Sequence, residues 1–133
     1  MLTISKDMEV GVAKIDTQHK ELVDRINALT KMGTQSVNSD ETKKTLDMLG
    51  SYVVKHFSDE EALQKQVNYP EYEAHKQLHK NFIGELDKLK KEFDQNGYSA
   101  KFTLEISNTV IKWIVSHIKG SDVKFGKFYN AAS

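Results

Sequence analysis

Residues 72–93 read YEAHKQLHKNFIGELDKLKKEF, and their apolar and histidine positions recur at intervals of three or four. That spacing places side chains on one face of an α-helix, whereas a half-buried strand would alternate at every second position. The face consists of Tyr72, His75, His79, Phe82, Leu86, Leu89 and Phe93. The segment therefore predicts an amphipathic helix with two histidines on its buried side.

The same spacing extends outward from this segment and predicts three further helices. The first begins at a cap on Asp16 and ends near Gly33, and the second begins at Ser39, followed by acidic Asp40 and Glu41. The segment Asn68-Tyr69-Pro70 with Glu71 opens the third helix, which Asn96-Gly97 closes. Ser99 caps a fourth helix that loosens at Gly120 before a short tail containing Phe125 and Phe128.

Short connections between long amphipathic helices favour antiparallel neighbours. We therefore expect an all-α fold, an antiparallel up-down-up-down four-helix bundle with an irregular N-terminal arm and a short C-terminal tail. At 133 residues, the chain has the size of one domain, here residues 1–133, and can bury a core of its own.

The composition narrows the classes of partner and cofactor. The 19 basic and 19 acidic residues cancel, so no net charge attracts nucleic acid. No cysteine is present, so thiolate nucleophiles and iron–sulfur clusters are excluded and a metal must be held by nitrogen and oxygen. No apolar run reaches the length of a membrane span, and no signal peptide is recognisable. We expect a cytoplasmic protein without nucleic-acid or membrane partners.

The central feature is that every histidine of the chain falls on an apolar helical face. They are His19, His56, His75, His79 and His117. A single histidine in such a position is more often a hydrogen-bonded core residue than a ligand. Burying five imidazoles with few polar partners is costly, and a metal in the core would compensate that cost.

The spacing of the histidines and carboxylates agrees with a shared metal site. His56 and Glu60 are four residues apart, as are His75 and His79, so each pair lies on one helix face. Each pair alone is a weak signal, and Glu60 alone would fit a surface acidic patch. Asp122 follows His117 by five residues, about 140° around a regular helix. It joins the site only if the helix widens or unwinds near Gly120, and we predict such a distortion. Without the histidines, a solvated aspartate at a helix end would be the preferred interpretation.

Four motifs together resemble the hemerythrin family, particularly its bacterial members. They are Val10-Gly11-Val12 with Ile15-Asp16-x-Gln18-His19-Lys20, His56-Phe57-x-x-Glu60-Glu61, His75-x-x-x-His79, and Trp113-x-x-x-His117-Ile118-x-x-x-Asp122. The resemblance spans nearly the whole chain in order and spacing. Many bacterial members carry a tryptophan near the start, where this chain has Ile4. This difference affects the packing of the N-terminal arm and not the metal site.

The resemblance implies a centre of two iron ions bridged by an oxide or hydroxide. It implies that His75, His79 and His117 bind one iron, that His19 and His56 bind the other, and that Glu60 and Asp122 bridge both. Two octahedral irons need about twelve ligand positions, and this set with the bridging oxygen leaves one open, on the iron of His19 and His56. Dioxygen is the ligand that the resemblance implies there.

Four apolar residues flank the ligands and are candidates for a wall around the bound oxygen: Leu22, Phe57, Trp113 and Ile114. They would equally fill the core of any helical bundle.

We interpret the chain as a binding protein: an oxygen carrier, store, delivery protein or sensor, with an unidentified electron donor or delivery partner. The alternative is an enzyme, a di-iron oxidase or peroxidase. A structural zinc site is disfavoured because it would use four ligands, whereas this set offers seven.

Overall fold

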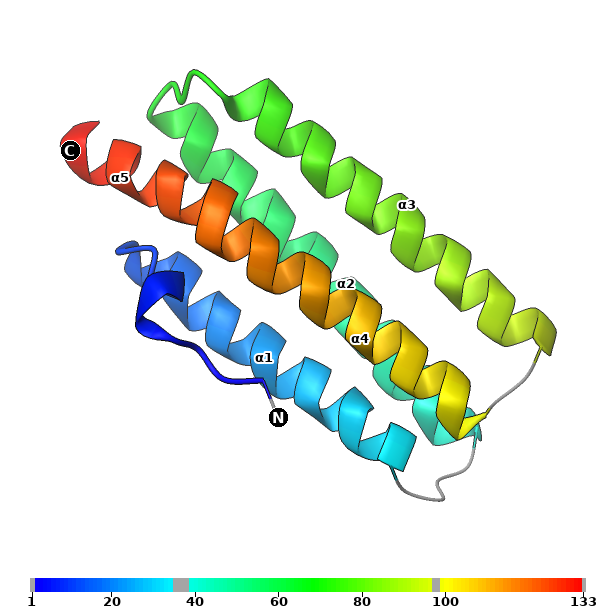
Figure 1. Ribbon diagram of the computed structural model, residues 1–133. Helices are drawn as coiled ribbons and strands as arrows, with labels where there is room; N and C mark the ends of the chain where they lie inside the picture. Colours follow the sequence, from blue (N-terminus) through cyan, green and yellow to red (C-terminus); the bar gives the residue numbers. More distant parts are fainter. Residues whose placement is uncertain (1, 35–38, 97–98, 133) are drawn as a thin grey trace.

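The computed structural model describes residues 2–34, 39–96 and 99–132, and it consists of helices packed side by side (Figure 1). A short 3-10 turn, η1 (Lys6–Met8), precedes the long helices α1 (Ala13–Thr34), α2 (Ser39–Gln66), α3 (Tyr72–Asn96) and α4 (Ala100–His117). A π-helical turn, η2 (Ile118–Asp122), joins α4 to α5 (Val123–Ala132). Successive long helices run in opposite directions, so the predicted antiparallel four-helix bundle is confirmed.

The first helix begins earlier than the sequence predicts. Helix α1 starts at Ala13, so Asp16 lies in its first turn and the prediction that Asp16 caps the helix is wrong. The Asp16 carboxylate instead accepts hydrogen bonds from the backbone N–H groups of Val10 (2.8 Å) and Gly11 (3.0 Å). Gly11 has a φ of +87°, a conformation that suits glycine. Asp16 thus ties the N-terminal arm to the helix.

The α2–α3 connection reverses the chain at the end of the bundle that carries the histidines. The second helix starts at Ser39, as predicted, whereas the third starts at Tyr72, just after Pro70. Asn68 adopts a left-handed φ of 55°, and the Tyr69 N–H donates to the carbonyl of Gln64 (2.9 Å), closing the last turn of α2. The predicted third-helix end at Asn96 is confirmed, and Gly97 lies outside the described residues.

The short C-terminal tail that the sequence predicts is helical and forms α5. Helix α5 continues from α4 because its aromatic side chains find partners: Phe125 is fully buried, with ring centroids 5.1 Å from Tyr69 and 5.9 Å from Tyr129. Gly126 lets this helix approach the N-terminal arm, because a Cβ there would lie 2.0 Å from the Val10 carbonyl oxygen.

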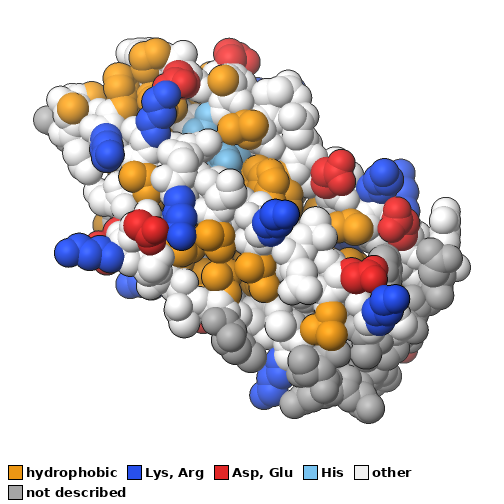
Figure 2. Space-filling model, viewed as in Figure 1, with side chains coloured by type: hydrophobic (Ala, Val, Ile, Leu, Met, Phe, Trp, Pro, Cys, Tyr) orange, Lys and Arg blue, Asp and Glu red, His pale blue; other side chains and the backbone are white. Residues whose placement is uncertain are grey.

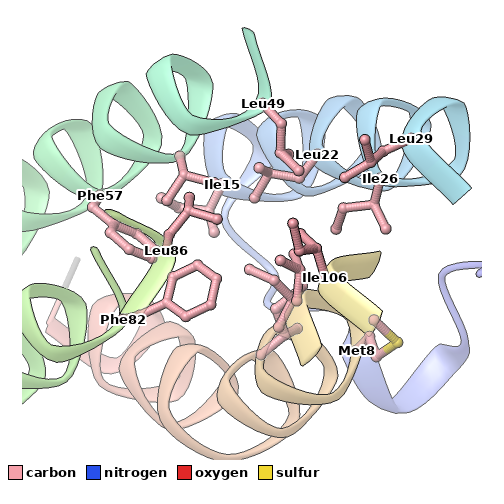
Figure 3. Close-up of a cluster of buried hydrophobic side chains, with 14 of the residues drawn as sticks. Met8, Ile15, Leu22, Ile26, Leu29, Leu49, Phe57, Phe82, Leu86 and Ile106 are labelled. Atoms are coloured by element: carbon pink, nitrogen blue, oxygen red, sulfur yellow. The ribbon is translucent and has the colours of Figure 1, made fainter. Parts of the chain in front are cut away.

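A continuous apolar core runs through the bundle (Figure 3). Ile15, Leu22, Ile26 and Leu29 line the inner face of α1 and meet Leu49 and Phe57 of α2, Phe82 and Leu86 of α3 and Ile106 of α4. The N-terminal arm adds Met8, Val10 and Val12, and Ile4 packs against the same core, partly buried. None of the helices in the described parts of the chain is long and apolar enough to span a membrane.

Candidate metal centre

The seven predicted ligand residues come together at one end of the bundle. His19 lies on α1, His56 and Glu60 on α2, His75 and His79 on α3, His117 at the end of α4 and Asp122 at the end of η2. All seven are between 0% and 6% exposed. Figure 2 shows only a small, recessed area of histidine surface on the face it presents. The structure thus places every predicted ligand residue in one buried cluster.

The first group of donors consists of Glu60, His75, His79, His117 and Asp122. The Nε2 atom of His117 lies 3.1 Å from the Nε2 atoms of both His75 and His79. His75 Nε2 lies 3.0 Å from Glu60 Oε1 and 3.0 Å from Asp122 Oδ1. Glu60 Oε1 is also 3.1 Å from His79 Nε2, and Asp122 Oδ1 is 3.0 Å from His117 Nε2.

These separations match the edge of a metal-centred octahedron. With bond lengths of about 2.1 Å, adjacent donors in an octahedron lie about 3.0 Å apart. The contacting pairs of this group are 3.0–3.1 Å apart. Five donors of this kind supply five of the six positions, so one position falls to a ligand that the protein does not provide. The group exceeds the four donors of a tetrahedral structural zinc site.

The second group consists of His19, His56, Glu60 and Asp122. His19 Nε2 lies 3.0 Å from Asp122 Oδ2, the oxygen of Asp122 that does not face His75 and His117. The imidazole rings of His19 and His56 meet edge to face, with centroids 4.8 Å apart. The two groups share both carboxylates, so two metal ions placed in them would be bridged by Glu60 and Asp122.

The π-helical turn brings Asp122 into the site. In an α-helix, residues five apart point about 140° away from each other. Here the Val123 N–H bonds to the carbonyls of Ile118 and Gly120, the helix widens by one residue, and Asp122 meets His117. The predicted distortion near Gly120 is confirmed.

Several buried polar atoms of the cluster make no well-directed hydrogen bond to any described residue, although histidine nitrogens lie 3.0–3.1 Å from some of them. Both carboxylate oxygens of Glu60 and of Asp122 belong to this set, as do both ring nitrogens of His19. Leaving a buried polar atom without a partner costs roughly 1–3 kcal/mol each, and more for charged groups. Cations between the carboxylates and imidazoles would satisfy the four carboxylate oxygens and the Nε2 atom of His19, so the residues fit a pair of metal ions held by nitrogen and oxygen.

Burial and the neighbouring charges shift the pKa values of the bridging carboxylates in opposite directions. Burial, together with the charge of Asp122, raises the pKa of Glu60 to about 8. The pKa of Asp122 is held well below its usual value by His117, His19 and His75, although burial opposes that shift. Without metal, the pair therefore stores a proton near Glu60 at neutral pH.

The pKa values of the histidines are also shifted in opposite directions. Although burial lowers it, the carboxylates of Asp122 and Glu60, each with an oxygen 3.0 Å from Nε2, raise the pKa of His75 to about 9. Burial, with the charge of His19, lowers the pKa of His56 to about 3. Burial, with the charges of His75 and His117, likewise lowers the pKa of His79. His56 and His79 are therefore neutral at pH 7, the form in which imidazole binds metal.

Two of the four predicted wall residues stack directly on histidines of the first group. The Phe57 ring lies parallel to His79 with centroids 3.8 Å apart, and the Trp113 ring lies 4.3 Å from that of His117. Leu22 and Ile114 are each 1% exposed and lie in the core, one turn from His19 and His117 respectively. Phe57 and Trp113 hold imidazole rings in place, and Leu22 and Ile114 are the remaining candidates for a wall.

Sequence reasoning missed the residues that hold the outer nitrogens of the histidines. Gln18 contacts His56 Nδ1, Glu61 contacts His79 Nδ1 (2.8 Å), and Gln64 contacts His75 Nδ1 (3.0 Å). Such partners orient imidazole ligands and fix which nitrogen carries the proton.

Gln64 was detectable in principle, because it follows Glu60 by one helical turn on the same buried face. It is fully buried, and its Oε1 atom has no partner among the described residues. A half-turn of its amide would let that oxygen accept a proton from His75 Nδ1. Gln18 and Glu61 contact histidines on neighbouring helices, so no spacing within one helix marks them.

Comparison with known proteins agrees with this geometry. The family model of the hemerythrin HHE cation binding domain matches residues 10–128. The bacteriohemerythrin of Methylococcus capsulatus is 30% identical to this chain over 131 residues, and the match covers 98% of each chain. The myohemerythrin of Theromyzon tessulatum is 31% identical, and the match covers 88% of this chain and 84% of the relative. A crystal structure of wild-type hemerythrin has a TM-score of 0.86 at 30% identity and covers 96% of this chain and 95% of its own. The chain therefore belongs to the hemerythrin family of oxygen-binding non-haem di-iron proteins.

Proposed function

We propose that this chain binds dioxygen reversibly at a pair of iron ions and acts as an oxygen carrier, store or delivery protein. In this proposal, His75, His79 and His117 hold one iron, His19 and His56 hold the other, and Glu60 and Asp122 bridge them. The observation that carries the proposal is the unequal division of donors, five in one group and four in the other, with both carboxylates shared.

The unequal division gives the two metal positions different roles. With one shared bridging oxygen, an octahedral iron held by the five donors would have all six positions filled, whereas an iron held by the four donors would keep one position for an external ligand. When bound, the iron pair supplies the electrons that dioxygen binding requires and recovers them on release. The ligand site of the proposal lies on the side of His19 and His56.

The protein's own contribution is to hold the donors rigidly and to exclude water. Phe57 and Trp113 stack on His79 and His117 and fix the ring planes. Leu22 and Ile114 are buried and apolar, and in the proposal they shield bound oxygen from water and protons. Loss of the oxygen as superoxide or peroxide requires protons or water, so this shielding favours release as dioxygen.

The donor set supports binding over oxidase chemistry. Five neutral imidazoles with two carboxylates provide less negative charge than a carboxylate-rich di-iron site, and therefore stabilise high-valent iron less. We accordingly propose a binding protein, with an oxidase or peroxidase as the alternative that the test must separate. The electron donor, the delivery partner and the cytoplasmic location stay predictions.

The optical spectrum of the iron-loaded protein tests the proposal. The reduced protein is prepared without oxygen, exposed to air, and then returned to an oxygen-free atmosphere without a reductant. Reversible binding predicts a visible absorption band that appears with air and disappears when oxygen is removed, over repeated cycles. A single irreversible change to the ferric spectrum, with peroxide released or consumed, would favour the enzyme.

A further inference from the structure

A chain of hydrogen bonds connects one of the proposed ligands to the surface of the bundle. The Nδ1 atom of His56 lies 2.7 Å from Oε1 of Gln18, and Nε2 of Gln18 donates to Oδ2 of Asp59 over 2.7 Å. Gln18 is 6% exposed, and the Asp59 side chain is 28% exposed. Lys14 and Lys55 each place their ammonium group 3.9 Å from the same Asp59 oxygen.

The donors and acceptors along these hydrogen bonds allow only one consistent placement of the protons. An ionised carboxylate only accepts hydrogen bonds, so the Gln18 amide must turn its NH₂ group toward Asp59. Its carbonyl oxygen then faces His56 and can only accept, so the His56 proton must reside on Nδ1. A neutral imidazole carries one N–H, and Nε2 is therefore left with its lone pair directed toward the carboxylates of the cluster.

We propose that Gln18, oriented by Asp59, is a positioning residue that fixes the proton of His56 on Nδ1 and thereby presents Nε2 to the metal. The metal position is that of His19 and His56, so this inference rests on the proposed function. The surface carboxylate sets the tautomer through a neutral amide, without bringing its own charge next to the imidazole.

The other ligands show that this arrangement is specific to His56. His79 donates its Nδ1 proton directly to the carboxylate of Glu61, 2.8 Å away, without an intervening amide. The Gln64 amide beside His75 has no second partner for its Oε1 among the described residues, so nothing described there fixes its orientation. His19 Nδ1 likewise has no partner in the described parts of the chain. Among these ligands, His56 alone has an amide whose orientation is dictated from outside.

The direct test is the tautomer of His56 in the metal-free, ¹⁵N-labelled protein, read from the ¹⁵N shifts and two-bond couplings of its ring. The wild type should show a single tautomer with the proton on Nδ1. Gln18→Met keeps the length of the side chain but removes both hydrogen bonds, and should give a mixture of tautomers. Asp59→Ala removes only the orienting acceptor and should give a partial shift. The matched control is Gln77→Met, which alters an exposed glutamine on α3 that donates a hydrogen bond to Asn81.

A compensating pair separates positioning from mere packing. In Gln18→Glu with Asp59→Asn, the new carboxylate can accept from both His56 Nδ1 and the asparagine amide, which should restore the single tautomer. Restoration of the single tautomer supports the positioning role of Gln18. An unchanged tautomer in both Gln18→Met and Asp59→Ala would overturn it, and if the Gln18 variant does not fold, Asp59→Ala decides alone.

Metal binding provides a second readout that needs no oxygen. Titration of metal-free protein with Co²⁺ should show two sites in the wild type, and Gln18→Met should weaken one by about 10–100-fold while leaving the other unchanged. Gln64→Met should weaken the opposite site. Equal binding by wild type and Gln18→Met at both sites would contradict the inference. Fewer than two sites in the wild type would instead contradict the proposed function, and the tautomer measurement would still decide the role of Gln18.

Discussion

His117 and Asp122 are five residues apart in the chain, yet His117 Nε2 and Asp122 Oδ1 lie 3.0 Å from each other. The π-helical turn between them is what brings the aspartate to the cluster. Asp122 also reaches His19 through its second oxygen, at 3.0 Å. A local irregularity of one helix therefore determines the geometry of both donor groups.

Adding one residue to the π turn should abolish tight binding of both irons. An alanine inserted after Gly120 would place the aspartate six residues after His117, about 240° around a regular helix and beyond the one-residue widening of the π turn, and so would turn Asp122 away from His117 and His19. Gly120→Ala is the matched control, because a Cβ at this position meets nothing within 4 Å. The measurement is iron content after loading. Two irons retained by the insertion variant would show that Asp122 is not a shared ligand.

The two bridging carboxylates should matter more than a terminal histidine. Glu60→Ala and Asp122→Ala are each expected to impair loading of both irons, because each residue belongs to both groups of donors. His19→Ala should chiefly affect the four-donor position. Iron content and the visible spectrum distinguish these outcomes. A carboxylate variant with both irons and an unaltered spectrum would remove that residue from the bridge.

The apolar residue Ile114 should protect bound oxygen. Ile114→Ala should leave a cavity at a stability cost of about 2–5 kcal/mol, and Ile114→Glu or Ile114→Lys should bring a polar group toward the site. All three should accelerate loss of the oxygenated absorbance, with iron content checked. Ile106→Ala is the control, because this residue is equally buried at 1% exposure but lies two turns farther from His117. If Ile106→Ala accelerated the decay as much, general loosening of the core would be the cause.

Metal loading should release protons at neutral pH. In the metal-free protein the pKa of Glu60 is raised to about 8 and that of His75 to about 9, so this contacting pair holds a proton at pH 7. Metal binding must displace that proton, so affinity should rise with pH below pH 8. Calorimetric Zn²⁺ titration in buffers of different ionisation enthalpy counts the protons. No proton release at pH 7 would contradict these protonation states.

The cluster of histidines and carboxylates could be predicted from sequence because the spacing that reveals it lies within each helix. His56 with Glu60 and His75 with His79 are four residues apart, and that spacing alone places each pair on one face. Because such pairs occur together with further histidines on buried faces, the sequence indicated one shared metal site in the core. The irregular His117–Asp122 spacing even indicated where the helix must widen.

Contacts between helices could not be predicted in the same way. Gln18 meets His56 and Asp59, which lie on another helix, so its role depends on how α1 packs against α2. The helical C-terminal segment depends on Phe125 packing against Tyr69, a contact that no local pattern reveals. The start of α1 at Ala13 likewise followed from the N-terminal arm, because Asp16 bonds backward to that arm instead of capping the helix.

The amount of oxygen taken up and returned by the reduced, iron-loaded protein tests the central claim most directly. We expect two irons per chain, uptake of one dioxygen molecule for each pair of irons, and recovery of the same amount as dioxygen when the gas phase is removed. The uptake is measured with an oxygen electrode, and the gas released on evacuation is measured separately. Oxygen that is consumed and not returned, with peroxide or water formed and ferric iron left behind, would contradict reversible binding and favour an oxidase.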